Sequence, residues 1–226
     1  MPIFSKEEDF MQLTGKKVVF LGDSITQGSG ASEQEKCYVS LFAATHKDAE
    51  IYNLGIGGTR LANQIGTYNE YYDANPFYTR IDKIPQDADL IVVFGGTNDY
   101  GHGDAPMGSF GDTTYATYYG ACYALLRDLQ LTVPNAKIVV CTPIHREGES
   151  NPATRSDGKW ILKDYVTALK QTAEYFALPV LDLWSTSGIQ PCVPFLKERL
   201  APDGLHPNDA GHALLCEKID AFIKAM

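Results

Sequence analysis

Short apolar runs alternate along the chain with longer segments in which apolar residues recur at spacings of three and four. The short runs lack polar alternation, which is typical of strands buried on both faces of a parallel sheet. The longer segments are typical of amphipathic helices. Together they predict right-handed crossovers and a three-layer α/β/α sandwich around a parallel sheet of about five strands. The predicted strands are 17–21, 50–54, 89–94, 137–141 and 179–183, and the main predicted helices are 38–45, 113–131, 159–176 and 207–225.

The composition indicates a folded globular chain. It has 226 residues, of which 44% are hydrophobic and 21% are charged, and no Pro/Gly/Ser-rich linker divides it. A single domain over residues 1–226 is therefore expected. The stretch 67–78 is rich in Tyr and Asn, and the stretch 100–114 is rich in Gly and Asp. Neither has a period, so both are predicted to be ordered surface loops.

Charge and cysteine usage narrow the possible partners. The net charge of -9 argues against nucleic acid or an anionic membrane, because both require clustered Lys and Arg. The first twelve residues carry four charged side chains where a secretory signal needs an apolar core, and no run approaches transmembrane length. A cytoplasmic protein is therefore expected. The five cysteines form no C-x-x-C pair, which favours reduced thiols over a disulfide framework or a zinc site.

The first predicted strand runs directly into residues 22–26 (GDSIT). Ser24 then stands between a buried strand and the N-terminus of a helix, at the carboxyl edge of the sheet where open α/β folds bind ligands. Its own backbone amide is one of the unpaired donors of that helix. This position suits a nucleophile, although a serine here could also serve only as a helix cap.

Small-residue turns also follow the second and third predicted strands. These turns are 55–58 (GIGG) and 95–99 (GGTND). Because the carboxyl ends of parallel strands share one edge, the three turns are expected to converge on a single site. The turn 55–58 matches neither the G-x-x-x-x-G-K-[ST] loop nor G-x-G-x-x-G, which argues against nucleotide binding.

Near the end of the chain, Asp203 and His206 lie three residues apart before the last predicted helix. A carboxylate at this spacing can orient an imidazole, as an acid–base pair of a serine hydrolase requires. The alternative is that both side chains only cap a turn and a helix. The order Ser24, Asp203, His206 along the chain favours catalysis over that alternative.

These blocks together resemble the SGNH or GDSL family of serine hydrolases, and the resemblance covers residues 22–207. Residues 22–25 (GDSI) resemble the nucleophile block, with isoleucine where the family name has leucine. Residues 203–206 resemble the last block, which supplies the orienting acid and the general base. The resemblance implies a flavodoxin-like sheet and ester hydrolysis that uses no metal and no other cofactor. The absence of G-x-S-x-G argues against the α/β-hydrolase alternative.

The two remaining blocks imply an oxyanion hole. Residues 53–59 (NLGIGGT) resemble the second family block, whose glycine amide is an oxyanion donor, here assigned to Gly58 with Gly57 as the alternative. The resemblance also implies that the side-chain amide of Asn98 is a donor. The expected mechanism has Ser24 attack an ester carbonyl while His206 takes its proton. The amides of Ser24, Gly58 and Asn98 then stabilise the oxyanion.

The family includes carbohydrate deacetylases, lipases, thioesterases and arylesterases, and its blocks do not distinguish them. Polar and aromatic loops favour a small-molecule or saccharide ester with a short acyl group, most simply acetyl on a sugar. Loop packing is the alternative role for the tyrosines. A non-catalytic binding module and a flavodoxin-type cofactor binder are further alternatives, and the oligomeric state stays open. The residues expected to line the site are Asp23, Tyr100, His102 and His145, with Tyr68, Tyr71, Tyr72, Asn69, Asn75 and Asp104 at its rim.

Overall fold

The fold is organised by one sheet of five parallel strands, as seen in a computed structural model that describes residues 12–226. The strand order is β2-β1-β3-β4-β5, so the first strand of the chain lies inside the sheet. Every neighbouring pair is parallel, which confirms the prediction from the unbroken apolar runs. The strands are β1 (Lys17–Gly22), β2 (Glu50–Gly55), β3 (Leu90–Phe94), β4 (Lys137–Cys141) and β5 (Val180–Leu181).

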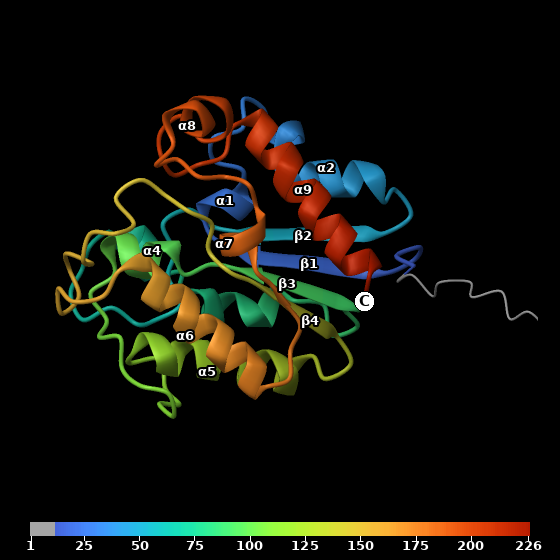
Figure 1. Cartoon of the computed structure of the whole chain (residues 1–226). Coiled ribbons are helices and arrows are strands. Elements are labelled where there is room, and N and C mark those ends of the chain that lie inside the picture. The colour runs from blue at the N-terminus through green and yellow to red at the C-terminus, as the bar shows by residue number, and fades with distance from the viewer. Residues whose placement is uncertain (1–11) are drawn as a thin grey trace, which may run out of the picture.

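Helices cover both faces of the sheet, which confirms the predicted α/β architecture (Figure 1). On one face pack α2 (Tyr38–Thr45) and α9 (Asp209–Lys224), against alternate strand residues such as Phe20 and Val92. On the other face pack α5 (Tyr118–Thr132) and α6 (Leu162–Tyr175). The shorter elements are α1 (Ser24–Gln27), η1 (Gln34–Lys36), α3 (Glu70–Asp73), η2 (Phe77–Lys83), α4 (Thr97–His102), α7 (Leu183–Thr186) and α8 (Pro194–Leu200).

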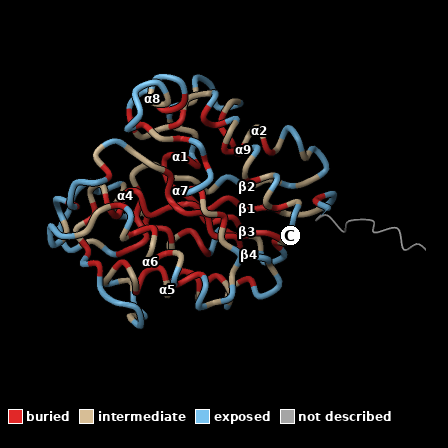
Figure 2. The backbone as a smooth tube through the Cα atoms, in the orientation of Figure 1, coloured by how far each residue is buried: buried red, intermediate tan, exposed pale blue. Residues whose placement is uncertain are grey.

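The core lies in two layers, one on each side of the sheet. Strands β1, β3 and β4 are largely buried in the middle of the molecule, the edge strand β2 is half-buried to exposed, and the connecting loops carry most of the exposed positions (Figure 2). The register places Gly22 opposite both Gly55 and Phe94, and Phe94 opposite Cys141. The carboxyl ends of four strands therefore stop at the same level, which brings the turns that follow them to one edge.

Helix α5 begins five residues later than the sequence predicts. The hydroxyl of Thr117 accepts a hydrogen bond from the backbone N–H of Gly120 at 3.1 Å and so caps the helix. The same hydroxyl donates to Asp112 Oδ2 at 2.8 Å. Residues 113–117 are therefore held outside the helix by a side-chain cap that competes with helical pairing.

The stretch 67–78, predicted as a loop, contains α3 and the start of η2. Asn69 begins α3, since its Oδ1 accepts hydrogen bonds from the backbone N–H groups of Tyr71 and Tyr72. No helix in the described part of the chain is long and apolar enough to cross a membrane. The charged residues before position 12, on which the expectation of a cytoplasmic protein rests, lie outside the described residues.

Candidate active site

Ser24 is presented by the abrupt turn that ends β1. Asp23 caps α1, because its Oδ1 accepts a hydrogen bond from the backbone N–H of Ile25 at 3.0 Å. Any side chain at Gly22 would overlap the side chain of Thr26, so the turn requires glycine. Ser24 becomes the first residue of the helix, with its hydroxyl at the floor of a cleft.

A chain of hydrogen bonds joins Ser24, His206 and Asp203. The Ser24 Oγ lies 3.0 Å from Nε2 of His206, and the Nδ1 of the same ring lies 2.7 Å from Asp203 Oδ2. An ionised carboxylate only accepts, so Nδ1 carries the proton and Nε2 is free to accept the serine proton. The structure thus brings together all three residues that the sequence proposes as nucleophile, base and acid.

Asp203 is held in place by the turn that contains it. Its Oδ1 accepts hydrogen bonds from the backbone N–H groups of Leu205 at 2.8 Å and His206 at 2.7 Å. Partial burial by itself raises the pKa of this carboxyl, but the hydrogen bonds from His206 and Leu205 outweigh burial and lower the pKa below its ordinary value. Asp203 therefore stays ionised and orients the ring.

The three residues expected to supply oxyanion donors, Ser24, Gly58 and Asn98, all line the same cleft. The structure distinguishes the two glycines left open by the sequence, because the backbone N–H of Gly57 donates to Gln27 Oε1 at 2.7 Å. The N–H of Gly58 has no hydrogen-bond partner within residues 12–226. Asn98 Nδ2 donates one hydrogen to Thr59 O at 3.0 Å, which fixes the amide and leaves its second N–H available. The backbone N–H of Ser24 is the third donor.

A buried arginine that the sequence analysis missed supports these turns. Arg80, on η2, is 1% exposed. Its guanidinium donates to Gly22 O at 2.7 Å, to Leu54 O, and to Thr59 Oγ1 at 3.0 Å. Burial lowers the pKa of Arg80 to about 10, which leaves it charged at neutral pH. Arg80 thereby ties the end of β1 to the end of β2.

Two buried carboxyls, Asp23 and Asp99, hold the turns of the site in place through hydrogen bonds. Burial raises the pKa of Asp23 to about 6, against the effect of its hydrogen bond from Ile25. Burial also raises the pKa of Asp99 to about 7, although Asp99 accepts hydrogen bonds from the backbone N–H groups of Leu61 and Ala62. Asp99 thus fixes the loop that follows Gly58 to the loop that carries Asn98.

The cleft above Ser24 has a volume of about 550 Å³. Of the residues expected to line it, His102 does, and Tyr68, Tyr71 and Tyr72 form part of its wall. The expected rim residues Asn69, Asn75 and Asp104 do not line it, since their side chains hydrogen-bond to loop backbone. Asn69 caps α3, Asn75 donates to Tyr71 O at 2.7 Å, and Asp104 accepts from Ile65 N and Gly66 N.

The structure corrects three expected lining positions. Asp23 is buried beneath the cleft as the cap of α1. The hydroxyl of Tyr100 lies 2.6 Å from the carbonyl oxygen of Gly148, so this ring points into the protein. His145 bonds Glu149 through Nδ1 at 2.9 Å and packs on Trp184 with 3.8 Å between the ring centroids. All three residues follow the end of a strand, as the sequence predicts, but the sequence does not show in which direction their side chains point.

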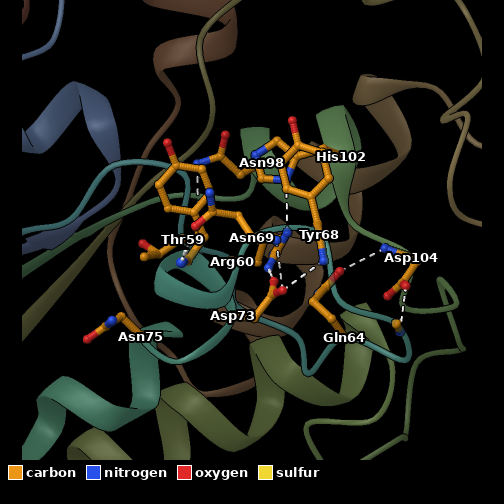
Figure 3. Close-up of polar contacts among 12 residues, drawn as sticks. Thr59, Arg60, Gln64, Tyr68, Asn69, Asp73, Asn75, Asn98, His102 and Asp104 are labelled. Atoms are coloured by element: carbon orange, nitrogen blue, oxygen red, sulfur yellow. Dashed lines mark hydrogen bonds and ion pairs between the residues drawn. The ribbon is translucent and has the colours of Figure 1, made fainter.

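The ring of His102 is held by a hydrogen bond from Arg60 (Figure 3). Its Nδ1 lies 2.9 Å from Arg60 Nη1, and because arginine only donates, the ring proton must be on Nε2. Burial and the charges of Arg60 and Arg146 lower the pKa of His102 to about 4. Tyr68 stacks on the ring with centroids 4.6 Å apart. His102 is therefore a hydrogen-bond donor beside Asn98.

Two further arginines near the site, Arg60 and Arg146, stand in no recognisable sequence motif. Arg60, 1% exposed, pairs with Asp73, which in turn accepts hydrogen bonds from Tyr68 N and Asn69 N. Arg146 lines the cleft directly, and its position just after His145 on the same sheet edge was the available hint. Within residues 12–226, no group of three His, Cys, Asp or Glu side chains could hold a metal ion.

Comparison with known proteins identifies the family and supports the fold. The model of the GDSL-like lipase/acylhydrolase family matches residues 20–214. One solved structure is 32% identical, with 96% of this chain and 99% of that chain covered and a TM-score of 0.82. A protein from Lactobacillus plantarum is 31% identical, with 94% and 98% covered and a TM-score of 0.79.

A more distant match has a described activity. A two-domain esterase active on acetylated mannans is 25% identical, with 93% of this chain and 50% of that chain covered and a TM-score of 0.61. A search of curated proteins finds no match. The family model spans most of the sequence, and the same residues carry the nucleophile turn and the acid–base turn. The chain belongs to the GDSL-like lipase/acylhydrolase family, and this membership implies hydrolase activity on esters.

Proposed function

We propose that the chain is a serine esterase that removes short acyl groups, acetyl above all, from a carbohydrate. The observation that carries the proposal is the hydrogen-bond chain from Ser24 through His206 to Asp203, with distances of 3.0 and 2.7 Å. These distances are within the reach needed for proton transfer. Family membership supports ester hydrolysis, and the geometry supports a covalent route through Ser24.

In the first half of the proposed reaction, Ser24 Oγ bonds to the ester carbonyl carbon and its proton passes to His206 Nε2. Asp203 stabilises the imidazolium that results. As the tetrahedral intermediate collapses, the carbon–oxygen bond to the alcohol breaks. His206 returns its proton to the leaving alcohol, which leaves the acyl group on Ser24.

In the second half, water takes the place of the alcohol. His206 removes a proton from the water, which attacks the acyl-enzyme carbonyl. As the second tetrahedral intermediate collapses, the bond from the carbonyl carbon to Ser24 Oγ breaks, His206 returns its proton to Ser24 Oγ, and the carboxylic acid leaves. Both tetrahedral intermediates place negative charge on the same oxygen. The N–H groups of Ser24 and Gly58 and the free amide hydrogen of Asn98 are the donors for it, and donors fixed in advance stabilise the charge without rearranging.

Three features support a short acyl group on a sugar. The rings of Tyr68 and Tyr71 at the cleft are 48% and 60% exposed, and such aromatic faces with polar neighbours suit hydroxyl-rich ligands. The wall of the cleft is otherwise made largely of glycine, amide and hydroxyl groups rather than aliphatic chains. One structural relative is described as active on acetylated mannans.

An acyl-length series tests the proposal. We expect kcat/KM to fall from p-nitrophenyl acetate through butyrate to octanoate, because a long chain needs an apolar groove to gain about 0.8 kcal/mol per buried methylene. Acetate release from acetylated oligosaccharides, measured with the same enzyme, should be abolished in Ser24→Ala. A rise in kcat/KM with chain length would instead indicate a lipase or thioesterase.

A further inference from the structure

The cleft above Ser24 carries a positive charge and no carboxylate. Arg146 lines it, and none of the other lining residues is an aspartate or a glutamate. This contrasts with a chain whose net charge is -9. Within residues 12–226 Arg146 forms no ion pair, whereas its neighbour Arg60 is paired with Asp73. The charge of Arg146 is therefore available to a ligand.

The guanidinium of Arg146 is fixed along one edge. Its Nη1 donates to Thr97 O at 3.1 Å and lies 3.3 Å from Thr97 Oγ1. Its Nε is buried without a hydrogen-bond partner, and the group lies over the ring of Tyr100 with 5.5 Å between Cζ and the centroid. Nη2 donates to no residue of the described part. A partly desolvated guanidinium with a free donor is stabilised by an acceptor from a ligand.

A neutral donor stands next to this charge. His102 follows Gly101, and a side-chain carbon at Gly101 would lie 2.5 Å from Arg146 Nη1. The hydrogen bond from Arg60 to Nδ1 places the ring proton of His102 on Nε2. Two carboxyls, Asp23 and Asp203, act electrostatically on Arg146, but both are hydrogen-bonded to other groups, because Asp23 caps α1 and Asp203 holds His206. The cleft wall thus offers donors to an anion and carries no carboxylate of its own, while the charges of Asp23 and Asp203 act on Arg146 from outside the wall.

We propose that Arg146, with the Nε2–H group of His102 beside it, binds a carboxylate carried by the substrate, so that the preferred substrate is an acetylated acidic sugar. A guanidinium matches a carboxylate in both charge and geometry. This subsite rests on the proposed esterase function, and it selects among acetylated sugars rather than taking part in bond breaking.

The test compares two sugars that differ only in the carboxylate. These are a methyl glucuronide and a methyl glucoside acetylated at the same hydroxyl, and the readout is kcat/KM for acetate release. We expect the wild type to prefer the glucuronide by about tenfold, the size of one partly exposed charge-assisted hydrogen bond. The preference should weaken as ionic strength rises.

Four variants locate the preference. Arg146→Gln should remove most of it, chiefly through KM for the glucuronide, and Arg146→Lys should keep part of it. Gly101→Ala displaces the guanidinium without changing net charge and should weaken the preference. Arg127→Gln makes the same charge change on α5, where Arg127 pairs with Asp128, and should preserve the preference.

Equal kcat/KM for the two sugars in the wild type would overturn the subsite and leave the esterase standing. An equal loss on both sugars in Arg146→Gln would also overturn it, since Arg146 would then act on the catalytic groups. Calorimetric titration of methyl glucuronide into Ser24→Ala, and into the same variant with Arg146→Gln, separates binding from catalysis. Binding that requires Arg146 supports the subsite even if neither acetate is released, and no binding to Ser24→Ala contradicts it.

Discussion

Gly57 and Gly58 are adjacent and chemically identical, and a single hydrogen bond separates their roles. The N–H of Gly57 is taken by Gln27 Oε1 at 2.7 Å, so it is not available to an oxyanion. Gly58 adopts φ +73, a conformation that favours glycine, and its Cα faces the ring of Tyr72. These contacts assign the proposed oxyanion amide to Gly58.

Alanine at the two positions should therefore have unequal effects. Gly58→Ala places a methyl group against the Tyr72 ring in a strained backbone conformation, which displaces the donor. We expect kcat to fall roughly 10²-fold, as when one oxyanion donor is lost. Gly57→Ala crowds the flexible end of Gln27, meets Ser24 Cβ at an ordinary contact distance of 3.6 Å, and should cost far less. Steady-state kinetics on p-nitrophenyl acetate decides, and a larger loss in Gly57→Ala would reverse the assignment.

His206, rather than His145, is predicted to be the general base. His206 reaches Ser24 Oγ and is held by Asp203, while His145 is engaged by Glu149 and Trp184. His206→Ala should lower kcat/KM by roughly 10⁴-fold or more, as removal of a triad base does. His145→Ala is the matched control and should retain most activity, with folding checked by circular dichroism. Loss of activity in His145→Ala alone would point to a different base.

Asp23 links the site to pH-dependent stability. Burial raises the pKa of Asp23 from 3.8 to about 6 in the folded chain, so the folded chain keeps a proton that the unfolded chain releases. Stability therefore falls as pH rises from about 4 to about 6, and the loss is complete above that range. Asn also caps helices, so Asp23→Asn keeps the cap.

We accordingly expect Asp23→Asn to increase the free energy of unfolding by about 2–3 kcal/mol at pH 8 and to have little effect near pH 4. Urea denaturation at both pH values measures the difference. A gain of the same size at both pH values would show that ionisation of Asp23 is not the cause.

At the level of single residues, the sequence identifies the side chains proposed to carry the chemistry but not those that hold the surrounding turns. Ser24, His206 and Asp203 stand in recognisable local turns, so their proximity could be predicted. Arg60 and Arg80 could not be identified, because their partners lie far away in the chain and appear only on folding. The outward or inward direction of Tyr100 and His145 likewise depends on tertiary packing.

The length of a helix or strand determines whether its hydrophobic pattern can be recognised in the sequence. The apolar runs of β1 to β4 and the periodic faces of α2, α5, α6 and α9 were all predicted, because many residues repeat the same signal. The short elements α3, α4, α7 and α8 contain four to seven residues, too few for a period to emerge. Their boundaries follow from caps such as Asn69, which resemble ordinary loop residues in a sequence.

Arg80 joins η2 to the ends of β1 and β2, so its removal should destabilise the fold. Arg80→Met removes the donors to Gly22 O, Leu54 O and Thr59 Oγ1 together. We expect a loss of roughly 3 kcal/mol or more in the free energy of unfolding, because each buried unsatisfied acceptor costs about 1–3 kcal/mol. Urea denaturation measures it, with Arg127→Met as the exposed control. A loss below about 0.5 kcal/mol, typical of surface substitutions, would contradict this role.

For the whole molecule, the parallel sheet explains why distant residues form one site. Strand order β2-β1-β3 places Ser24, Gly58 and Asn98 on three neighbouring turns at the carboxyl edge. The loop between α8 and α9 brings His206 within hydrogen-bond distance of Ser24. The sequence predicts the sheet and the convergence of these turns. It does not predict the positive charge of the cleft, because the conformation of the loop after β4 is what places Arg146 there.

Covalent labelling tests whether Ser24 is an activated nucleophile. A serine activated by His206 attacks an organophosphonate, so intact-mass spectrometry of the wild type should show one adduct per chain. Ser24→Ala should show none under the same conditions, and His206→Ala should label far more slowly. Stoichiometric labelling of Ser24→Ala, or no labelling of the folded wild type, would show that Ser24 is not an activated nucleophile.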